Sequence, residues 1–366
     1  MDDKNLEYSL TILSELGHIP SVPFHEKWMS NKIKSELQSL EISWEEDPYK
    51  NIIACIPGKI PSTPPQGLIY IAHMDHPGYE IVGIENDYLL AKPLGGIPYY
   101  GKNPGVKLII VPDISVRINA TIVKPSDNDP DLLLVQPQQQ YTFENFPIAT
   151  IFDLDDFKLE DDYIKMRALD DLAGCASILA VLKTISQNPP DTDVYGVFTV
   201  AEEVGLIGAR LLASSNKLPK SLYAISIESS KTLPGAVIGS GPVIRVGDAG
   251  TTFNNEAESV LVKAKEKLSK ISDTFCSQRQ LMSGGVCEAS AFSSNGYKST
   301  GIAYPLANYH NGGDNEKIKS EYIHKDDFFN GVKLLHESAY QIDETTHTNF
   351  QRRFTSVPKD IIQRLS

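Results

Sequence analysis

The sequence predicts an α/β fold in which a mixed, mostly parallel sheet is flanked by helices and carries an inserted small β domain. Short β-branched runs such as residues 68–72 and 194–200 alternate along the chain with helical patterns, which is typical of an α/β sheet. Residues 79–165 have a different sequence pattern. β-Branched runs there alternate with Gly, Pro and Asn, and no long helical pattern occurs. A chain of 366 residues is long enough for both parts.

Each element follows from a local pattern. Cys175, Ile178, Leu179 and Leu182 recur at helical spacing and predict a helix with one apolar face. The same reasoning predicts helices over 25–40, 172–185, 205–215 and 326–342, and strands within 51–58, 68–72, 194–200, 221–227 and 301–307. We therefore expect a catalytic α/β domain made of residues 1–78 plus 166–366, interrupted by a β-rich domain over residues 79–165.

Composition excludes several classes of partner. The net charge of −13 disfavours nucleic acid and anionic membrane surfaces. No apolar run reaches the length of a membrane helix, and the first residues are acidic where a secretory signal is basic. The four cysteines form no close pair, so neither a zinc ribbon nor a disulfide framework is indicated. A cytoplasmic location is expected.

Acidic and histidine residues follow several of the predicted strands. They are His73 and Asp75, Glu202 and Glu203, Glu228, and His310, while Asp170 and Asp171 immediately precede the helix over 172–185. Ligand sites of open α/β sheets form at the carboxyl ends of strands and near helix N-termini. These side chains are therefore expected to meet at one edge of the sheet.

Imidazole and carboxylate without thiolate are the ligands of borderline divalent metals. A carboxylate that bridges two ions, with a histidine and another carboxylate on each side, makes a two-metal hydrolytic site. Simpler readings exist: Asp170 can cap its helix, Glu202 and Glu203 can be a solvated helix start, and Glu228 can lie in a polar loop. The residues alone leave these alternatives open.

Four segments carry a family resemblance: AHMDHPG from residue 72, RALDDLAGC from residue 167, FTVAEEVGLIGA from residue 198, and NYH from residue 308. Together they resemble the dinuclear-metal exopeptidases, and within these the tetrahedral (TET), deblocking and glutamyl aminopeptidase family. The resemblance runs in order along nearly the whole chain, and the segment over 79–165 is similar to the small β domain of that family.

The resemblance implies a role for each candidate residue. His73 and Glu228 would bind one metal ion, Glu203 and His310 the other, and Asp170 would bridge both. Glu202 would be the general base, and the Asp75 carboxylate would orient His73. The two divalent ions are expected to be zinc, with cobalt or manganese as alternatives.

The chain departs from the family pattern at several positions. Glu228 stands where the family usually has aspartate, and His76 stands where it usually has glutamate. The segment around His310 lacks the usual arginine and spacer residue, and residues 284–289 only approximate the Gly-Thr-Asp-Ala motif. No ligand type is lost, so these departures affect the expected substrate more than the expected metal binding.

The expected function is that of a metalloprotease: an exopeptidase that hydrolyses terminal peptide bonds with a water held by two metal ions, most simply an aminopeptidase acting on a peptide or small amide. Because glutamate, Glu228, stands at a ligand position where the family usually has aspartate, a carboxypeptidase or N-acyl amino acid deacylase is the alternative within the same clan. A catalytically silent interaction protein is the alternative of another class. The resemblance also implies a homo-oligomer, while the net charge argues against a nucleic-acid or membrane partner.

Overall fold

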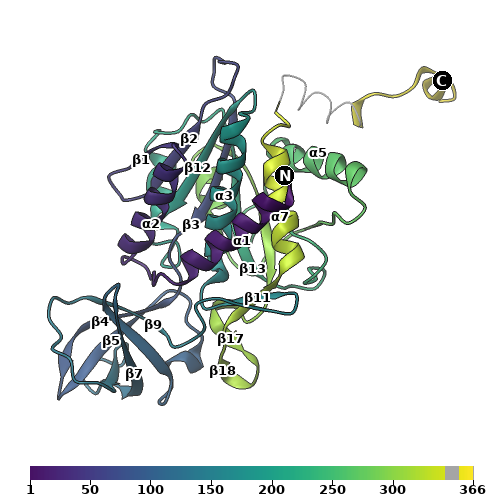
Figure 1. Ribbon diagram of the computed structural model, residues 1–366. Coiled ribbons are helices and arrows are strands. Elements are labelled where there is room, and N and C mark those ends of the chain that lie inside the picture. The colour runs from purple at the N-terminus through teal and green to yellow at the C-terminus, as the bar shows by residue number, and fades with distance from the viewer. Residues whose placement is uncertain (343–353, 366) are drawn as a thin grey trace.

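The computed structural model describes residues 1–342 and 354–365. An eight-stranded mixed sheet forms its centre, and the four strands β12, β3, β13 and β16 run parallel to one another in the middle of it (Figure 1). In spatial order the strands are β1 (Ser43–Glu46), β2 (Ile52–Ile56), β12 (Asp193–Thr199), β3 (Gly67–His73), β13 (Tyr223–Lys231), β16 (Lys298–Leu306), β14 (Val243–Arg245) and β15 (Gln278–Gln280). The α/β class and the mixed sheet agree with the sequence prediction.

Side-chain alternation along the strands explains why both faces of the sheet are covered. In β3 every residue is buried, and Leu68 and Tyr70 pack into one apolar cluster while Ile69 and Ile71 pack into another. The first cluster also contains side chains from α1 (Asp3–Gly17), α2 (Lys27–Ser39), α3 (Leu169–Gln187), α5 (Asn255–Ile271) and α7 (Lys325–Ser338). The second contains side chains from α4 (Ile207–Ser214) and α6 (Glu288–Ser294).

Helix α3 is more deeply buried than its sequence pattern indicates. The predicted apolar face of Cys175, Ile178, Leu179 and Leu182 is buried, and so is every other residue from Leu169 to Leu182. The helix lies between the sheet and α1 (Figure 1), so no side of this stretch faces solvent. Such complete burial fixes the position of the first turn of α3, where Asp170 lies.

A closed six-stranded barrel follows β3 in the chain and lies beyond one end of the sheet (Figure 1). Its strands, in the order in which they pair, are β4 (Gly78–Glu85), β5 (Tyr88–Leu94), β8 (Leu133–Pro137), β7 (Val116–Pro125), β6 (Lys107–Asp113) and β9 (Ile148–Phe152). A short 3₁₀ helix, η1 (Tyr99–Lys102), lies between β5 and β6. Tyr79 and Phe152 meet edge to face inside the barrel, with ring centroids 5.5 Å apart.

Two smaller sheets connect the barrel to the rest of the fold. Strands β10 (Lys158–Glu160) and β11 (Tyr163–Met166) pair with the late strand β19 (Glu321–His324). Strands β17 (Gly312–Gly313) and β18 (Lys317–Ile318) form a hairpin that follows the 3₁₀ turn η2 (Tyr309–Asn311) and whose strands are joined by the 3₁₀ turn η3 (Asp314–Glu316). The barrel thus occupies residues 78–152, and the division of the chain into domains at residues 79 and 165 stays a prediction.

The C-terminal segment adds the short helix α9 (Lys359–Gln363), which carries no buried residue. Among the described residues, no helix is both long enough and apolar enough to cross a membrane.

Candidate metal centre

The carboxyl ends of the central parallel strands bring the predicted residues together. His73 is the last residue of β3 and pairs in register with Thr199, the last residue of β12. Glu202 and Glu203 follow β12 within a few residues. Glu228 is an exception to the prediction, because it lies inside β13 and not after it, paired with Ala303 of β16.

Asp170 and His310 reach the same place from two irregular segments. Asp170 lies in the first turn of α3, where its φ and ψ of −86° and 103° are not helical. His310 lies in η2 with φ +52°, in the left-handed region that few non-glycine residues adopt. The structure therefore assembles all the predicted ligand residues, although neither of these two segments has regular helical geometry at the site.

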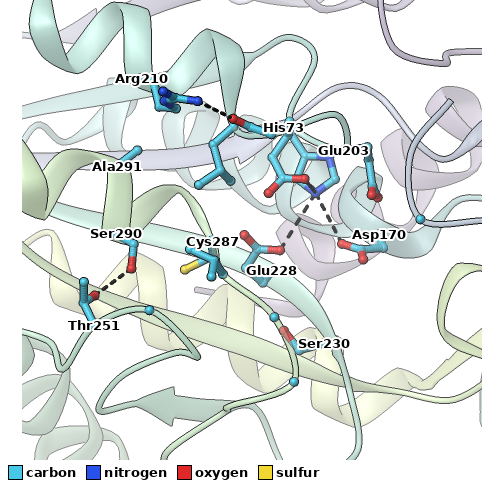
Figure 2. Close-up of a pocket in the computed structure, with 18 of the residues that line it drawn as sticks. His73, Asp170, Glu203, Arg210, Glu228, Ser230, Thr251, Cys287, Ser290 and Ala291 are labelled. Atoms are coloured by element: carbon cyan, nitrogen blue, oxygen red, sulfur yellow. Dashed lines mark hydrogen bonds and ion pairs between the residues drawn. The ribbon is translucent and has the colours of Figure 1, made fainter.

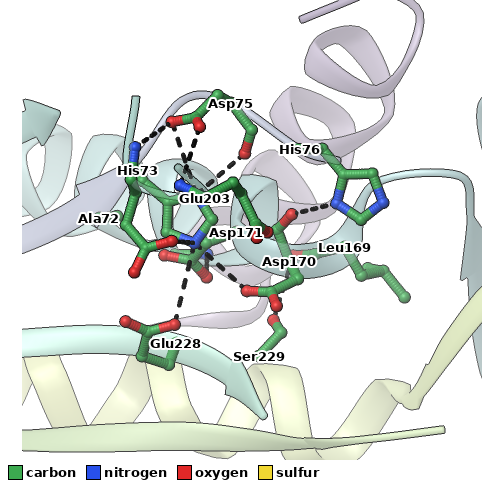
Figure 3. A network of polar contacts seen from close by, with 12 residues as sticks. Ala72, His73, Asp75, His76, Leu169, Asp170, Asp171, Glu203, Glu228 and Ser229 are labelled. Atoms are coloured by element: carbon green, nitrogen blue, oxygen red, sulfur yellow. Dashed lines mark hydrogen bonds and ion pairs between the residues drawn. The ribbon is translucent and has the colours of Figure 1, made fainter. Parts of the chain in front are cut away.

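The two carboxylate oxygens of Asp170 face two different histidines. His73 Nε2 lies 3.4 Å from Asp170 Oδ1 and 3.8 Å from Glu228 Oε2. His310 Nε2 lies 3.7 Å from Asp170 Oδ2 and 3.3 Å from Glu203 Oε2. Figures 2 and 3 show the side chains of His73, Asp170, Glu203 and Glu228 converging.

These distances fit metal ligation. Donor atoms bound at 2.0–2.2 Å to a tetrahedral ion lie roughly 3.3–3.6 Å apart. Two groups that share Asp170, His73–Asp170–Glu228 and Asp170–Glu203–His310, each offer three donor atoms within 4.8 Å of one another. A third group, His73–Glu202–Glu203, meets the same distance criterion without Asp170. His310 Nε2, Asp170 Oδ1 and Glu203 Oε1 are also buried without a hydrogen-bond partner, which is costly for polar atoms unless a cation binds there.

Glu202 and Glu203 differ in their surroundings. Glu203 contacts His310, and this histidine lowers the pKa of Glu203 although burial alone would raise it. Glu202 Oε2 lies 3.8 Å from His73 Nε2, and burial raises the pKa of the Glu202 carboxyl well above its ordinary value. A carboxyl with a raised pKa that lines the pocket is suited to proton transfer.

The contact between Asp75 and His73 differs in one respect from the sequence prediction. His73 Nδ1 donates a hydrogen bond to the backbone carbonyl of Asp75 at 2.9 Å, whereas the carboxylate oxygen Oδ1 is 4.0 Å away. The Asp75 carboxylate instead accepts hydrogen bonds from the backbone N–H groups of Glu202 and Glu203, at 3.0 and 3.1 Å. Asp75 therefore orients His73 through its main chain and holds the Glu202–Glu203 turn through its side chain.

His76 has a role that its position in the sequence did not suggest. Its Nδ1 donates to the backbone carbonyl of Asp170 at 2.6 Å (Figure 3). Its Nε2 lies 3.1 Å from Asn311 Oδ1. His76 is buried, and burial lowers its pKa to about 4. The residue that departs from the family pattern is thus part of the support for Asp170.

Two more buried carboxyl groups lie around the centre and were not predicted as site residues. Glu26 accepts a hydrogen bond from the backbone N–H of Ala201 at 2.9 Å, and burial, with Asp75 nearby, raises its pKa to about 7. Glu288 accepts a hydrogen bond from Thr199, and burial likewise raises its pKa to about 7. Glu288 lies in the stretch that only approximates the family motif, which was the one available signal for it.

The centre contains more acidic groups than basic ones. Burial raises the pKa of Glu228 to about 8, and neighbouring Asp170 and Glu288 add to this. Burial alone would lower the pKa of His310, but Glu203 and Asp170 raise it to about 9. Two histidines are thus surrounded by several buried carboxyl groups, an arrangement that divalent cations would neutralise.

The centre opens into a pocket of about 1110 Å³ whose other wall carries positive charge. Arg210, Lys231 and Arg245 line this pocket together with the metal-centre residues. Arg245 is only 2% exposed, and its Nε and Nη1 atoms have no hydrogen-bond partner. Its guanidinium lies 5.8 Å from the ring centroid of Phe253, which holds the group in place.

Sequence comparisons find relatives of this chain. The sequence profile of the M42 glutamyl aminopeptidases matches residues 149–334. A protein of Acetivibrio thermocellus named "Putative aminopeptidase" is 24% identical over 341 residues, which cover 89% of this chain and 97% of the relative.

Solved structures share the fold. The TET1 peptidase of Pyrococcus horikoshii, described as able to assemble into a tetrahedron or a large octahedral shell, superposes with a TM-score of 0.76 at 23% identity, covering 91% of this chain and all of its own. A TET aminopeptidase from a marine sediment archaeon of the Thaumarchaeota gives a TM-score of 0.79 at 18% identity, covering 94% of this chain and 99% of its own.

Proposed function

Because this chain belongs to the M42 glutamyl aminopeptidase family, we propose that it is a metal-dependent aminopeptidase whose centre is built from the residues described above. Peptidase activity follows from the family and from the aminopeptidase relative. The assignment of individual residues rests on the geometry at Asp170. Its two oxygens face His73 and His310 separately, and this arrangement is the observation that carries the proposal.

Two divalent ions fit the donor set. His73, Asp170 and Glu228 would hold one ion, and Asp170, Glu203 and His310 the other. Zinc is the ion we propose, with cobalt and manganese as substitutes, because imidazole and carboxylate ligands do not discriminate sharply among these metals. When bound, such ions supply Lewis-acid activation of a water molecule and of the scissile carbonyl.

The side chains around the ions carry the proton transfers. Glu202 lines the pocket beside His73 and belongs to neither of the two groups that share Asp170, so its carboxylate can take a proton from the attacking water and deliver it to the departing amine. Asp75 fixes the backbone of Glu202 and Glu203 and thereby the direction of both carboxylates. Glu26 holds the preceding residue, Ala201, whose φ of +51° turns the chain toward the pocket.

The charge of the pocket wall also favours one class of substrate. An N-terminal residue bound with its amine near the carboxylates of the centre places its side chain in the remainder of the pocket, where Arg245 has unpartnered N–H groups. A buried guanidinium without a partner favours a carboxylate in the ligand. We therefore propose that peptides with an N-terminal acidic residue are preferred substrates.

The proposal is tested by measuring metal content and substrate class together. Metal-loaded protein should contain two ions per chain and should hydrolyse aminoacyl substrates with a free amine. N-acetylated substrates and N-acyl amino acids, tested side by side, should be poor substrates. Activity confined to the blocked substrates would favour the carboxypeptidase or deacylase alternative, and absence of any hydrolysis by the two-ion protein would favour the silent one.

We also propose a homo-oligomer, because the structural relative from Pyrococcus horikoshii assembles into closed particles. Light scattering coupled to size-exclusion chromatography measures this directly, and a mass equal to one chain would contradict it. The cytoplasmic location stays a prediction from the sequence.

A further inference from the structure

Glu321 is a fully buried carboxylate at the start of β19, outside all three groups of candidate metal ligands. Within the described part of the chain, its side chain accepts hydrogen bonds only from backbone N–H groups. Oε2 accepts from Leu169 at 2.8 Å and from Asp170 at 3.1 Å, and Oε1 accepts from His310 at 2.8 Å. One carboxylate thus joins the backbones of two predicted metal ligands that are 140 positions apart in the chain.

Both backbones need such a partner. The first N–H groups of a helix have no acceptor within the helix, and Ala168, the residue before α3, provides no side-chain cap. His310 adopts a left-handed conformation in a short 3₁₀ turn, where regular hydrogen bonding does not fix the main chain. Glu321 satisfies the N–H groups of both segments at once.

The opposite side of the Asp170 main chain is held as well. His76 Nδ1 donates to the Asp170 carbonyl at 2.6 Å, while Glu321 accepts from the Asp170 N–H. The side chain of Asp170 therefore projects from a main chain that is fixed at both of its polar groups. Its Oδ2 can then lie 3.7 Å from His310 Nε2, and the His310 main chain is fixed by the same Glu321.

We propose that Glu321 is a positioning residue that sets the distance between Asp170 and His310, and so shapes the ion site made by Asp170, Glu203 and His310. This inference rests on the proposed function. Glu321 contacts neither the pocket nor a predicted donor atom, and its action is confined to the backbones of the ligands. Residues that orient metal ligands typically change metal affinity by about 10–100-fold when they are replaced.

Glu321→Gln tests the inference because an amide has a single acceptor oxygen. Whichever way the amide turns, its NH₂ group faces either the His310 N–H or the N–H groups of Leu169 and Asp170, and that contact is lost. Titration of the metal-free protein with Zn²⁺ by calorimetry should show one of the two ions bound about 10–100-fold more weakly and the other little changed. The visible spectrum of the Co²⁺ form should change in parallel.

Asp327→Asn is the matched control. Asp327 is also fully buried and accepts two backbone N–H groups, from Gly239 at 2.7 Å and Gly241 at 2.6 Å, but these glycines hold no predicted ligand. The control variant should lose thermal stability and keep both ion affinities. Should Glu321→Gln fail to fold, Glu321→Asp keeps two acceptor oxygens on a shorter side chain, and a smaller weakening of the same ion is expected.

Three outcomes decide the matter. Selective weakening of one ion in the Glu321 variant, absent in the Asp327 variant, supports the inference. Unchanged affinity for both ions in a folded Glu321 variant, or equal weakening in the control, overturns it while the proposed function stands. Wild-type protein that binds fewer than two ions overturns the proposed function, and the inference with it.

Discussion

His310 donates a hydrogen bond from Nδ1 to the backbone carbonyl of Gly96, at a distance of 2.9 Å. Gly96 lies just after β5, the second strand of the barrel, so a ligand of the α/β part is oriented by a residue of the barrel part. A carbonyl can only accept, and the proton of the ring is therefore held on Nδ1. Nε2 faces Asp170 and Glu203, so in the neutral ring its lone pair points to the place where a metal ion would bind.

Gly96→Ala should weaken metal binding at His310. A Cβ at this position would lie 2.5 Å from His310 Nδ1 and 2.6 Å from Cε1, so the imidazole ring must move. Because a displaced ligand loses both its orientation and its hydrogen bond, we expect the affinity for one Zn²⁺ to fall about 10–100-fold. Calorimetric titration of the metal-free variant measures the change.

Gly83→Ala is the control for that substitution. It also adds a methyl group to a glycine of the barrel, but nothing lies within 4 Å of the new Cβ. Metal affinity in this variant should equal that of the wild type. If both variants lose affinity to the same extent, the contact between Gly96 and His310 is not the cause.

Glu202→Gln should nearly abolish turnover while both ions remain bound. Glutamine keeps the size of the side chain and removes the base, and positioned proton transfer contributes on the order of 10²–10⁴-fold to rate. The measurement pairs kcat with metal content per chain. Loss of a metal ion together with activity would show that Glu202 is a ligand and that the roles of Glu202 and Glu203 have been exchanged.

Metal removal should lower stability as well as activity. Without cations, the buried carboxyl groups of Asp170, Glu203 and Glu228 are left with unpaired or protonated oxygens. A ligand that binds only the folded state stabilises it by about 2.7 kcal/mol at a concentration of 100 times its Kd. Chelator should therefore lower the melting temperature and Zn²⁺ should restore it; an unchanged melting temperature would argue against a metal ion in the folded protein.

Much of the fold follows from local patterns. The runs over 68–72 and 194–200 predicted the adjacent parallel strands β3 and β12, and their carboxyl ends place His73 beside Glu202 and Glu203. Glu228 was predicted to follow its strand because polar residues come after it. In the structure, pairing with β16 continues through those polar residues as far as Lys231, which periodicity within one strand cannot reveal.

The hydrogen bonds that support the ligand residues could not be predicted from the sequence. Glu321 bonds to Leu169 across 152 positions, and no spacing rule connects residues so far apart. Strands β10 and β11 lie in the segment predicted as the inserted domain, yet β11 pairs with β19 from the far end of the chain. Local patterns indicate which residues can carry the chemistry, whereas the hydrogen bonds that orient them depend on tertiary packing.

His336, on α7 and remote from the centre, should make stability depend on pH between about 4 and 6.5. Burial, with the chain's N-terminal ammonium and Lys267 nearby, lowers its pKa from 6.5 to about 4 in the folded state. Between these values the unfolded chain binds the proton and the folded chain does not, so acid favours unfolding. The contribution is fully present above pH 6.5 and is lost as pH falls toward 4, by at most about 3 kcal/mol.

The matching variant is His336→Gln, which cannot be protonated in this range. Urea unfolding at several pH values gives the free energy of unfolding of both proteins. The difference between wild type and variant should change steadily between pH 6.5 and 4 and be constant above pH 7. A difference that does not depend on pH would contradict a lowered pKa for His336.

The last prediction concerns Arg245 and the preferred substrate. Arg245 lines the pocket, and its Nε and Nη1 have no hydrogen-bond partner among the described residues although both atoms are buried, so we expect a substrate carboxylate to bind the part of the guanidinium that lines the pocket. Hydrogen bonds to charged groups contribute about 1.5–3 kcal/mol, which corresponds to roughly 10–150-fold in kcat/KM. Arg245→Met should therefore lower the ratio of kcat/KM for N-terminal glutamate over N-terminal alanine by about that factor.

Arg210→Met is the control, because Arg210 lines the same pocket from an exposed position and should change the ratio much less. Metal content of both variants is measured with the kinetics, since Arg245 lies near Glu228 and lowers its pKa. A ratio unchanged in Arg245→Met that retains two ions would rule out Arg245 as the residue that selects acidic substrates.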